Sequence, residues 1–582
     1  MIKTLSKQIK EYKLASVMTP FFMILEVICE TVIPLLMSSI IDNGVEKGNI
    51  DHIYSMAAFM ILVAVVSLFS GYMGGKLSTY ASSGFAKNLR QAMYENIQTF
   101  SFSNIDKYST SGLVTRLTTD VSNLQQAYQM MLRMFVRAPS SLIVAMIMAF
   151  RINSRLAMIY LYALIILSVG MILIMMRSMK YFQQVFRKYD DLNESVQENV
   201  SAIRVVKAYV REDYEEQKFK RASKNIYDLF LKAERAVSWQ SPLMSGTVYA
   251  CILLISWLGA RMIVQNELTT GSMMSLLTYC TYILMSLMML GMIFLMVTMS
   301  TASIHRISEV LNEKSDLTNP ENPVYEVEDG SVEFDHVDFA YRTGTGQNVL
   351  SDINFRIESG ETVGILGMTG SGKSSLVSLI CRLYDVNNGS VKVGGKDVRE
   401  YDLDTLRNSV SIVLQKNELF SGTIYENLRW GDEDATDEEC QRAAEIAQAD
   451  AFIRQFPDGY NTYIEQGGTN VSGGQKQRLC IARALLKKPK ILILDDSTSA
   501  VDTATDAKIR KSFREDLPEM TKFIIAQRIH SVMDSDKIIL LKDGMISGFG
   551  THDELMKTNQ AYREIYEAQT SGSGDFDEGG DF

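Results

Sequence analysis

Hydrophobic residues in the first half of this chain form long runs, some of them interrupted by single polar residues. A helix needs about 20 apolar residues to cross the hydrocarbon core of a bilayer. Six stretches reach this length, and we expect each to be a membrane-spanning helix: about 15–40, 54–78, 129–150, 156–178, 241–263 and 273–302. The pattern therefore predicts an α-helical membrane domain with six spans over residues 1–303.

The segments between these runs alternate between short and long. Those at 41–53, 151–155 and 264–272 are short, whereas those at 79–128 and 179–240 are long, polar and patterned like helices. Clusters of Gly and Pro, which end helices, are absent from 179–238. We therefore expect the membrane helices to continue well beyond the lipid, in preference to two small inserted domains.

Basic residues near the ends of the runs indicate an orientation, because Lys and Arg are enriched on the cytoplasmic side. They precede the first run, follow the fourth and precede the fifth: Lys3, Lys7, Lys10, Lys13, Arg177, Lys180, Arg187, Lys188, Lys232 and Arg235. The first short loop is acidic instead, although Arg151 and Arg155 in another short loop depart from the rule. We expect a multi-pass cell-membrane protein whose N-terminus and soluble domain are cytoplasmic.

After about residue 330 the pattern changes to short apolar runs that alternate with helical segments. Five runs have the composition of buried strands: Val332–Phe334, Thr362–Leu366, Ser411–Leu414, Ile491–Leu494 and Phe523–Ala526. This alternation predicts an α/β domain with a largely parallel sheet over residues 329–568, joined to the membrane domain by a charged linker at 304–328. The Gly-, Ser- and acid-rich tail at 569–582 should be disordered.

Composition narrows the class of protein. A chain of 582 residues suggests two or three domains. The formal net charge of −10 is modest, and no basic patch with interleaved aromatic residues occurs, so we expect no nucleic-acid partner. The six cysteines have no paired spacing, which favours buried free thiols over a metal site or a disulfide framework.

A phosphate-binding loop follows the second predicted strand. The segment GMTGSGKS at Gly367–Ser374 matches G-x-x-x-x-G-K-[ST], and it lies between a strand and a helix as this motif requires. Lys373 would reach the β- and γ-phosphates of ATP, and the hydroxyl of Ser374 would bind Mg²⁺. Neighbouring residues would surround the phosphates with backbone N–H groups or contact the nucleotide: Gly370, Ser371, Gly372 and Ser375.

Three further residues are candidates for the same site. Asp495 ends the strand ILILD and could hold Mg²⁺ through water. Gln415 follows the strand SIVL and could sense the γ-phosphate and the metal, although a Gln after a strand is usually only a loop residue. Tyr341 could stack on adenine, although a core role is the default for a lone aromatic residue.

The segment NVSGGQKQR at 470–478 resembles the signature of ATP-binding cassette (ABC) proteins, and the resemblance extends over nearly the whole chain. Six spans followed by one cassette resemble an exporter half-transporter. The segments at 104–121 and 198–213 are similar to the family's two intracellular loops, which implies coupling helices near Tyr108–Gly112 and Arg211–Glu215. STSAVD at 497–502 resembles the loop by which two cassettes communicate.

The resemblance implies a dimer in which each ATP lies between one cassette's phosphate loop and the other cassette's signature. The signature residues would then contact the γ-phosphate of an ATP held by the partner subunit: Ser472, Gly473, Gly474 and Gln475. A serine hydroxyl, glycine N–H groups and the start of a helix suit such an anion.

Two positions depart from the family pattern where hydrolysis is expected. The family has Glu after the Mg²⁺ aspartate, but this chain has Asp496. The Asp side chain is shorter by one methylene, which draws its carboxylate back by about 1.5 Å. The family's switch histidine is Gln527 here, and Gln exchanges no proton near neutral pH. His530 occupies a different position, and Gln466 replaces a usual Glu before the signature.

Altered hydrolytic positions beside an intact signature predict a heterodimer. This chain would supply a degenerate ATP site at Asp496 and Gln527, and it would lend Ser472 to the partner's catalytic site. The alternatives are a homodimeric, slow-cycling lipid or peptide exporter and an ATP-gated regulatory or channel-like protein.

The membrane half carries only a weak indication of substrate. Glu26 and Glu30 lie four residues apart on the first span and so share one helix face. Charged residues inside a membrane are costly, and they indicate function by default. They could attract hydrophobic or amphipathic cations of the multidrug type, but it is equally open that they face water or pair with another helix.

Overall fold

The computed structural model describes residues 2–341, 348–496 and 501–570. The chain forms two compact units. One comprises Met1–Gln98 and Thr110–Glu313, and the other comprises Thr99–Ser109 and Lys314–Phe582. The second unit therefore includes a short segment taken from the helical half of the sequence.

Six helices in the first unit are long and apolar enough to cross a membrane, which confirms the predicted six-span architecture. The helices that contain these spans are α2 (Lys13–Ser39), α3 (Ile50–Gln98), α6 (Val121–Ile152), α7 (Ser154–Ser201), α10 (Gln240–Val264) and α11 (Thr270–Asn312). Shorter elements join them: α1 (Ile2–Ser6), η1 (Lys7–Tyr12), η2 (Ile40–Val45), α5 (Thr110–Thr115) and η3 (Arg116–Asp120).

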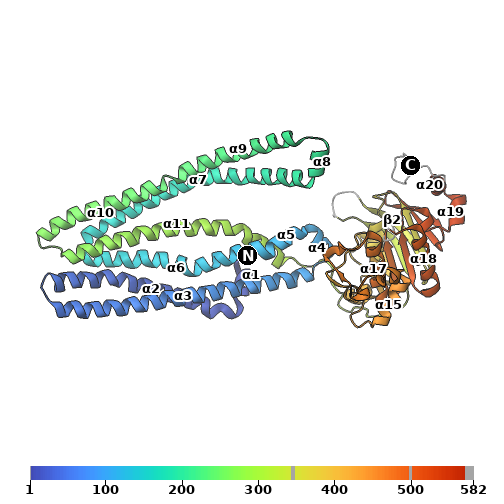
Figure 1. Cartoon of the computed structure of the whole chain (residues 1–582), viewed down its shortest axis with the longest axis horizontal. Coiled ribbons are helices and arrows are strands. Elements are labelled where there is room, and N and C mark those ends of the chain that lie inside the picture. Colours follow the sequence, from blue (N-terminus) through green and yellow to red (C-terminus); the bar gives the residue numbers. More distant parts are fainter. Residues whose placement is uncertain (1, 342–347, 497–500, 571–582) are drawn as a thin grey trace. The chain divides into compact units, whose positions relative to one another are not determined.

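Several of these helices are much longer than a bilayer is thick. At 1.5 Å per residue the 49 residues of α3 extend about 75 Å, against a hydrocarbon core of about 30 Å. Helix α7 runs to Ser201, and the chain returns through α8 (Ile203–Ala208) and α9 (Glu212–Val237), which lies beside α7 (Figure 1). The long polar segments are thus helical extensions, and no inserted domain occurs among the described residues.

A buried apolar cluster holds four of the spans together. It draws on α6, α7, α10 and α11, with Tyr160, Tyr279 and Ile255 fully buried at its centre. The hydroxyl of Tyr160 donates a hydrogen bond of 2.7 Å to the carbonyl of Leu276. This bond satisfies a polar atom that would otherwise be costly inside an apolar environment.

The second unit contains the predicted α/β domain. Its main sheet has the order β12-β11-β3-β10-β9-β6, and its strands are parallel except for β12. These strands are β3 (Thr362–Gly367), β6 (Val410–Val413), β9 (Ile491–Asp495), β10 (Thr521–Ile525), β11 (Lys537–Lys542) and β12 (Met545–Gly550). The main sheet is therefore largely parallel, as the sequence predicts.

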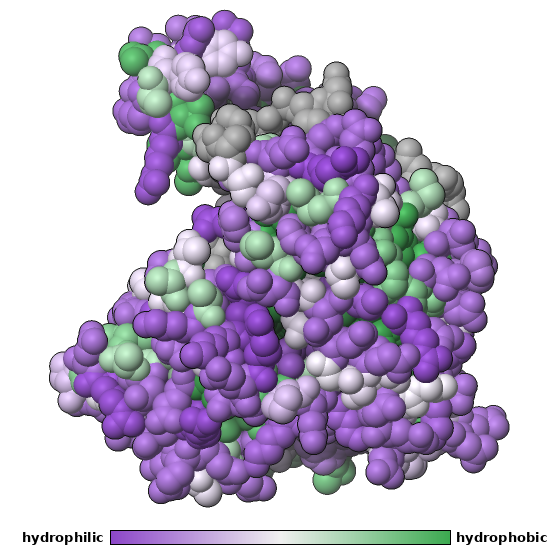
Figure 2. Space-filling model, turned by 90° about the vertical axis from the view of Figure 1, so that its right-hand side faces the viewer, coloured by the Kyte–Doolittle hydropathy of each residue, from purple (hydrophilic) through white to green (hydrophobic). Residues whose placement is uncertain are grey.

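Two further sheets and nine helices complete the described part of this unit's cassette. The antiparallel sheet β2-β1-β4-β5 consists of β1 (Val332–Phe339), β2 (Leu350–Ile357), β4 (Asn388–Val393) and β5 (Lys396–Asp397), and β7 (Gly422–Thr423) pairs with β8 (Tyr463–Ile464). The helices are α12 (Lys373–Ile380), α13 (Leu403–Ser409), α14 (Ile424–Leu428), α15 (Asp437–Ile446), α16 (Asp450–Ile453), α17 (Gly473–Leu486), α18 (Thr503–Asp516), α19 (His552–Thr558) and α20 (Gln560–Thr570). The face in Figure 2 is predominantly hydrophilic, with hydrophobic residues in small separate groups.

The short segment from the helical half is α4 (Phe102–Lys107), which packs with the cassette. Its N-terminus is capped by Ser101 in a reciprocal arrangement with Asn104. The helices α4 and α8 each end just before a position at which the sequence predicts a coupling helix. All six cysteines of the chain are buried, as predicted.

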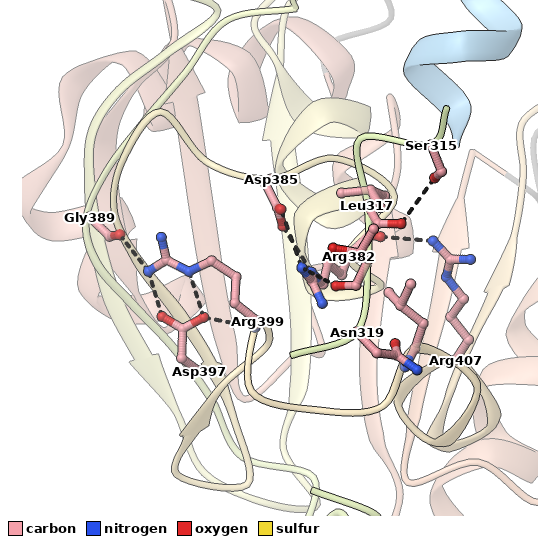
Figure 3. Close-up of polar contacts among 11 residues, drawn as sticks. Ser315, Leu317, Asn319, Arg382, Asp385, Gly389, Asp397, Arg399 and Arg407 are labelled. Atoms are coloured by element: carbon pink, nitrogen blue, oxygen red, sulfur yellow. Dashed lines mark hydrogen bonds and ion pairs between the residues drawn. The ribbon is translucent and has the colours of Figure 1, made fainter. Parts of the chain in front are cut away.

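The predicted linker at 304–328 begins as the last turns of α11 and continues as a segment held against the cassette. Arg382 donates to Asp385 at 2.9 Å and to the carbonyl of Thr318 at 3.3 Å (Figure 3). Arg407 donates to the carbonyl of Arg382 at 3.0 Å. These bonds fix the path by which the chain enters the cassette.

Candidate functional site

Three neighbouring parallel strands bring the predicted site residues to one edge of the sheet. Strand β10 pairs in register with β3 on one side and with β9 on the other. The carboxyl ends of parallel strands meet at the same edge, where ligands bind in open α/β sheets. The phosphate loop after β3, Asp495 at the end of β9 and Gln527 after β10 therefore converge.

The phosphate loop depends on glycine at two positions. Gly370 and Gly372 have φ angles of +85° and +96°, in a region that side chains disfavour. A Cβ on Gly372 would lie 2.8 Å from Leu350 Cδ2 and 3.0 Å from the carbonyl oxygen of Val349, whereas a Cβ on Gly370 would meet nothing within 4 Å. The loop is thus closely backed by protein at Gly372 and open at Gly370.

The polar groups of this loop suit a phosphate. Lys373 begins α12, and its ammonium donates to the carbonyls of Gly367 and Met368, both at 2.8 Å. The Ser371 hydroxyl is buried and has no hydrogen-bond partner in the part of the chain that the structure describes. A buried polar atom without a partner is costly, so a ligand that accepts its hydrogen bond fits here.

Ser374 and Asp495 form a pair of oxygen ligands. The hydroxyl of Ser374 donates to Asp495 Oδ1 at 3.0 Å, and Asp495 is only 6% exposed. Burial raises the pKa of the Asp495 carboxyl, a rise that the hydrogen bond from Ser374 opposes and the charge of Asp496 reinforces. A hydroxyl beside a carboxylate suits Mg²⁺, which would supply positive charge to the phosphate oxygens.

Asp496 is hydrogen-bonded to two glutamine side chains. The amide of Gln527 donates to Asp496 Oδ2 at 3.1 Å, and Gln415 contributes a second hydrogen bond. Burial raises the pKa of the Asp496 carboxyl, against the Gln415 bond and the charges of Lys373 and Arg528. The backbone of Asp496 is left-handed, with a φ of +49°. The two altered positions are thus in direct contact.

Tyr341 lies in an aromatic cluster beside the phosphate loop. Its hydroxyl shares a hydrogen bond of 2.8 Å with Ser375 on α12, and the residue is 49% exposed. Tyr384 meets the Tyr341 ring edge to face at 5.1 Å and also contacts Phe102 of α4 at 6.2 Å. The hydroxyl of Tyr384 donates to Asp106 of α4 at 2.6 Å. An adenine stacked on Tyr341 would therefore be one ring away from the contacts of α4.

The signature residues form the start of α17. The Ser472 side chain accepts a hydrogen bond from the N–H of Gln475 at 3.3 Å, and the Gln475 side chain accepts one from the N–H of Ser472 at 2.9 Å. Gly473 and Gly474 form the first turn. Within the described residues the Ser472 side chain bonds only inside this capping box.

The sequence also pointed to three further positions: the predicted communication loop, His530 and Gln466. Ser497–Ala500, in the predicted communication loop, lies outside the described residues. His530 is exposed in the turn η6 (Ile529–Ser531). Gln466 is exposed at the start of η5 (Gln466–Gly468), which precedes the signature.

Glu26 and Glu30 on α2 are paired with a cation on another helix of the same chain. Arg137 on α6 contacts Glu26 at 2.5 Å and Glu30 at 2.8 Å. The sequence left open whether these carboxylates face water or pair with another helix, and the structure shows that they pair with α6. Two carboxylates thus share one guanidinium. The second oxygen of Glu26, Oε2, is buried without a hydrogen-bond partner among the described residues.

Comparison with known families gives two matches along this chain. The model described as ABC transporter transmembrane region matches residues 17–313, and the model described as ABC transporter matches residues 350–499. The chain belongs to the ABC transporter family. It is a half-transporter in which the membrane domain and the ATPase domain are fused.

Individual relatives align with this ABC transporter over most of its sequence. The "Uncharacterized ABC transporter ATP-binding protein YfiB" of Bacillus subtilis (strain 168) is 35% identical over 561 residues, which cover 96% of this chain and 97% of that protein. The "Probable multidrug resistance ABC transporter ATP-binding/permease protein YheI" of the same organism is 32% identical over 518 residues, covering 89% and 88%.

A solved structure supports the same fold. The "Structure of a bacterial Atm1-family ABC exporter with ATP bound" superposes with a TM-score of 0.81 and covers 96% of this chain and 99% of that chain, at 23% identity. By its two family matches the ABC transporter described here is a multi-pass membrane protein with six candidate spans among the described residues, and its cassette binds ATP. Exporters of this family dimerise.

Sequence reasoning missed several contacts of this transporter. Arg137 could have been noticed as a charge within an apolar run that must find a partner. The contact of Tyr384 with Asp106 joins residues 278 positions apart, and no local pattern indicates such a pairing.

Proposed function

We propose that this chain is the degenerate-site subunit of a heterodimeric ABC exporter. One observation carries the proposal: the Ser472 capping box is intact, while Asp496 and Gln527 occupy both hydrolytic positions and bond to each other at 3.1 Å. A signature kept in working geometry serves a partner's ATP site. The cassette that carries it is altered where its own ATP would be hydrolysed.

The chemistry of the altered pair explains slow hydrolysis. A general base that positions water contributes about 10²–10⁴ in rate. The shorter carboxylate of Asp496 is drawn toward amide donors, and Gln527 can hydrogen-bond a phosphate but cannot take or give a proton near neutral pH. The site would still hold Mg²⁺ and ATP through Lys373, Ser374 and Asp495.

Retention of ATP at this site would hold the cassette dimer closed. ATP held between this phosphate loop and the partner's signature would keep the two cassettes together through several turnovers of the other site. The contact of Tyr384 with α4 supports transmission of nucleotide occupancy toward the membrane helices. Hydrolysis at the partner's site, completed by Ser472, would then reset the cavity between inward and outward states.

Exposed apolar side chains on both units are consistent with an interface to a second subunit. Tyr209 and Val210, at the tip between α8 and α9, are 75% and 80% exposed. On the cassette Phe420 and Trp430 are also exposed, and their rings stack at 3.9 Å. We propose that each tip docks on the partner's aromatic pair, because burial of such side chains stabilises an interface. The basic N-terminus supports a cytoplasmic location for the tips and the cassettes.

The substrate class we propose is hydrophobic or amphipathic, with a preference for cations. Glu26, Glu30 and Arg137 together have a formal net charge of −1, and Glu30 keeps 35% of its side chain exposed. A cation entering from the lipid would offset this charge in a medium of low dielectric. The name of the relative YheI, a probable multidrug resistance transporter, is consistent with this class.

Co-purification tests the heterodimer. The tagged chain should retain a second half-transporter that has Glu and His at the positions of Asp496 and Gln527, and the mass of the complex should equal one copy of each. Inverted vesicles containing the pair should accumulate a cationic dye only with hydrolysable ATP. A stable homodimer with full ATPase activity contradicts the asymmetric proposal, and dye gating without turnover contradicts export.

A further inference from the structure

The last described helix is tied to the backbone of the switch segment by a single side chain. The Gln569 side chain on α20 accepts a hydrogen bond from the N–H of Ile529 at 2.8 Å and donates one to the carbonyl of Gln527 at 3.0 Å. The amide thus pairs with the peptide groups on both sides of Arg528, as a neighbouring strand would. We call this pair of bonds the Gln569 clasp.

Helix α20 is itself firmly placed on the cassette. Tyr562 is fully buried, and its hydroxyl shares a hydrogen bond of 2.8 Å with His552 of α19. Ile565 packs against the buried cluster that contains Ile529, the residue whose N–H the clasp binds. The clasp therefore connects the switch segment to a rigid support, and it is more than the chance contact of a frayed chain end.

The Gln569 clasp binds the backbone of the residue whose side chain contacts Asp496. It fixes the backbone of Gln527, whose side chain donates to Asp496 at 3.1 Å. A hydrogen bond of this length is lost when its donor moves by about 1 Å. We propose that Gln569 is a positioning residue of the ATP site, which holds the switch segment so that the Gln527 amide reaches Asp496 and the γ-phosphate.

This inference rests on the proposed role of Gln527 at the ATP site, and it extends that role to the end of the cassette. It also gives α20 a part in nucleotide retention. Any event that lifts α20 from the cassette would release the switch segment and shorten the lifetime of bound ATP, without touching the phosphate loop.

Release of nucleotide from this chain measures the effect directly. The full-length transporter, purified with the subunit that accompanies it, is loaded with radiolabelled azido-ATP and Mg²⁺ and then diluted into unlabelled ATP. Photocrosslinking at successive times and separation of the subunits on a gel report the nucleotide left on this chain alone. Loss of one net hydrogen bond, about 1 kcal/mol, corresponds to about fivefold faster release.

The variants form a graded series. Gln569→Ala removes both bonds and should release nucleotide about fivefold faster. Gln569→Glu keeps an acceptor for Ile529 but no donor for Gln527, and it should lie between Gln569→Ala and the native chain. Gln560→Ala is the matched control, because Gln560 lies on the same helix and bonds only to Glu564 within it at 2.8 Å. Its release rate should be native.

A double-mutant cycle separates positioning from simple stabilisation. Gln527→Ala alone tests the proposed function: unchanged retention would overturn the role of Gln527, and the inference with it. If Gln527→Ala speeds release, adding Gln569→Ala should speed it no further. Additive effects, or native release from Gln569→Ala and Gln569→Glu, would overturn the clasp while leaving the proposed function in place.

Discussion

Ser472→Ala and Asp496→Asn are expected to have very different effects on ATP turnover, although both change one polar group of the same cassette. In the asymmetric exporter that we propose, Ser472 would serve the partner's active site, and Asp496 would serve the site that turns over slowly. Ser472→Ala should therefore remove most of the ATPase activity of the complex, and Asp496→Asn should remove little of it.

The magnitudes follow from the contacts. Loss of a group that stabilises transition-state charge costs about 10²–10³ in rate. The Ser472 side chain also accepts from the N–H of Gln475 at 3.3 Å, so its removal costs about 1 kcal/mol of helix capping. That is well below the 5–15 kcal/mol of a typical domain, and the cassette stays folded. If misplacement already slows the Asp496 site by about 10², that site supplies about 1% of turnover.

The assay is phosphate release by the reconstituted complex at saturating Mg²⁺ and ATP. Thr436→Ala is the matched control for capping: Thr436 forms a capping box on α15, accepting from the N–H of Glu439 at 3.2 Å, in a helix outside the site described above. It should lose similar stability and keep native turnover. Equal losses from Ser472→Ala and Asp496→Asn would refute the asymmetric reasoning and support two equivalent sites.

Three further predictions concern other parts of the site and the membrane helices. Asp496→Glu together with Gln527→His should raise hydrolysis at this chain's own site about tenfold or more, measured as phosphate release in a complex whose other site is silenced; no gain would show that the defect lies elsewhere. Arg137→Met should lower the thermal unfolding midpoint, since it leaves two partly buried carboxylates without their cation, whereas Glu30→Gln leaves the Arg137–Glu26 pair and should cost little; equal losses would contradict the pairing. Because burial raises the pKa of Asp495, Mg²⁺ affinity should fall on acidification at a higher pH than for an ordinary aspartate, and Asp495→Asn should abolish that step in a Mg²⁺ titration. The stability of the ligand-free cassette should move the other way, falling as the pH rises through the pKa of Asp495, because the folded state binds the extra proton.

Much of the site was predictable because its parts are local in sequence. A phosphate loop needs glycines at fixed offsets, and Gly372 does have a left-handed backbone with no room for a Cβ. Asp495 ends a strand whose five residues are all buried, which the apolar run before it indicates. The capping box of Ser472 and Gln475 follows from their spacing of three residues.

The contacts between distant residues were not predictable in this way. The order of strands in the sheet places Gln527 against Asp496, 31 positions away, and only the pairing of β10 with β9 brings them together. The pairing of Arg137 with Glu26 and Glu30 depends on which faces of α2 and α6 meet, and single-helix periodicity does not say this. The Gln569 clasp depends on how α20 packs over Ile529.

By itself, then, the sequence determined the six spans and the α/β cassette, because hydrophobic length and the alternation of strands and helices act along the chain. The residues that we expect to bind ATP stay a prediction from motif spacing. Tertiary structure alone decided that Asp496 and Gln527 share a hydrogen bond, that Glu26 and Glu30 pair with Arg137, and that Gln569 of the last described helix bonds to the backbone of Gln527 and Ile529. The physical reason is that these interactions join groups brought together by sheet order and helix packing, which bury apolar surface wherever it lies in the sequence.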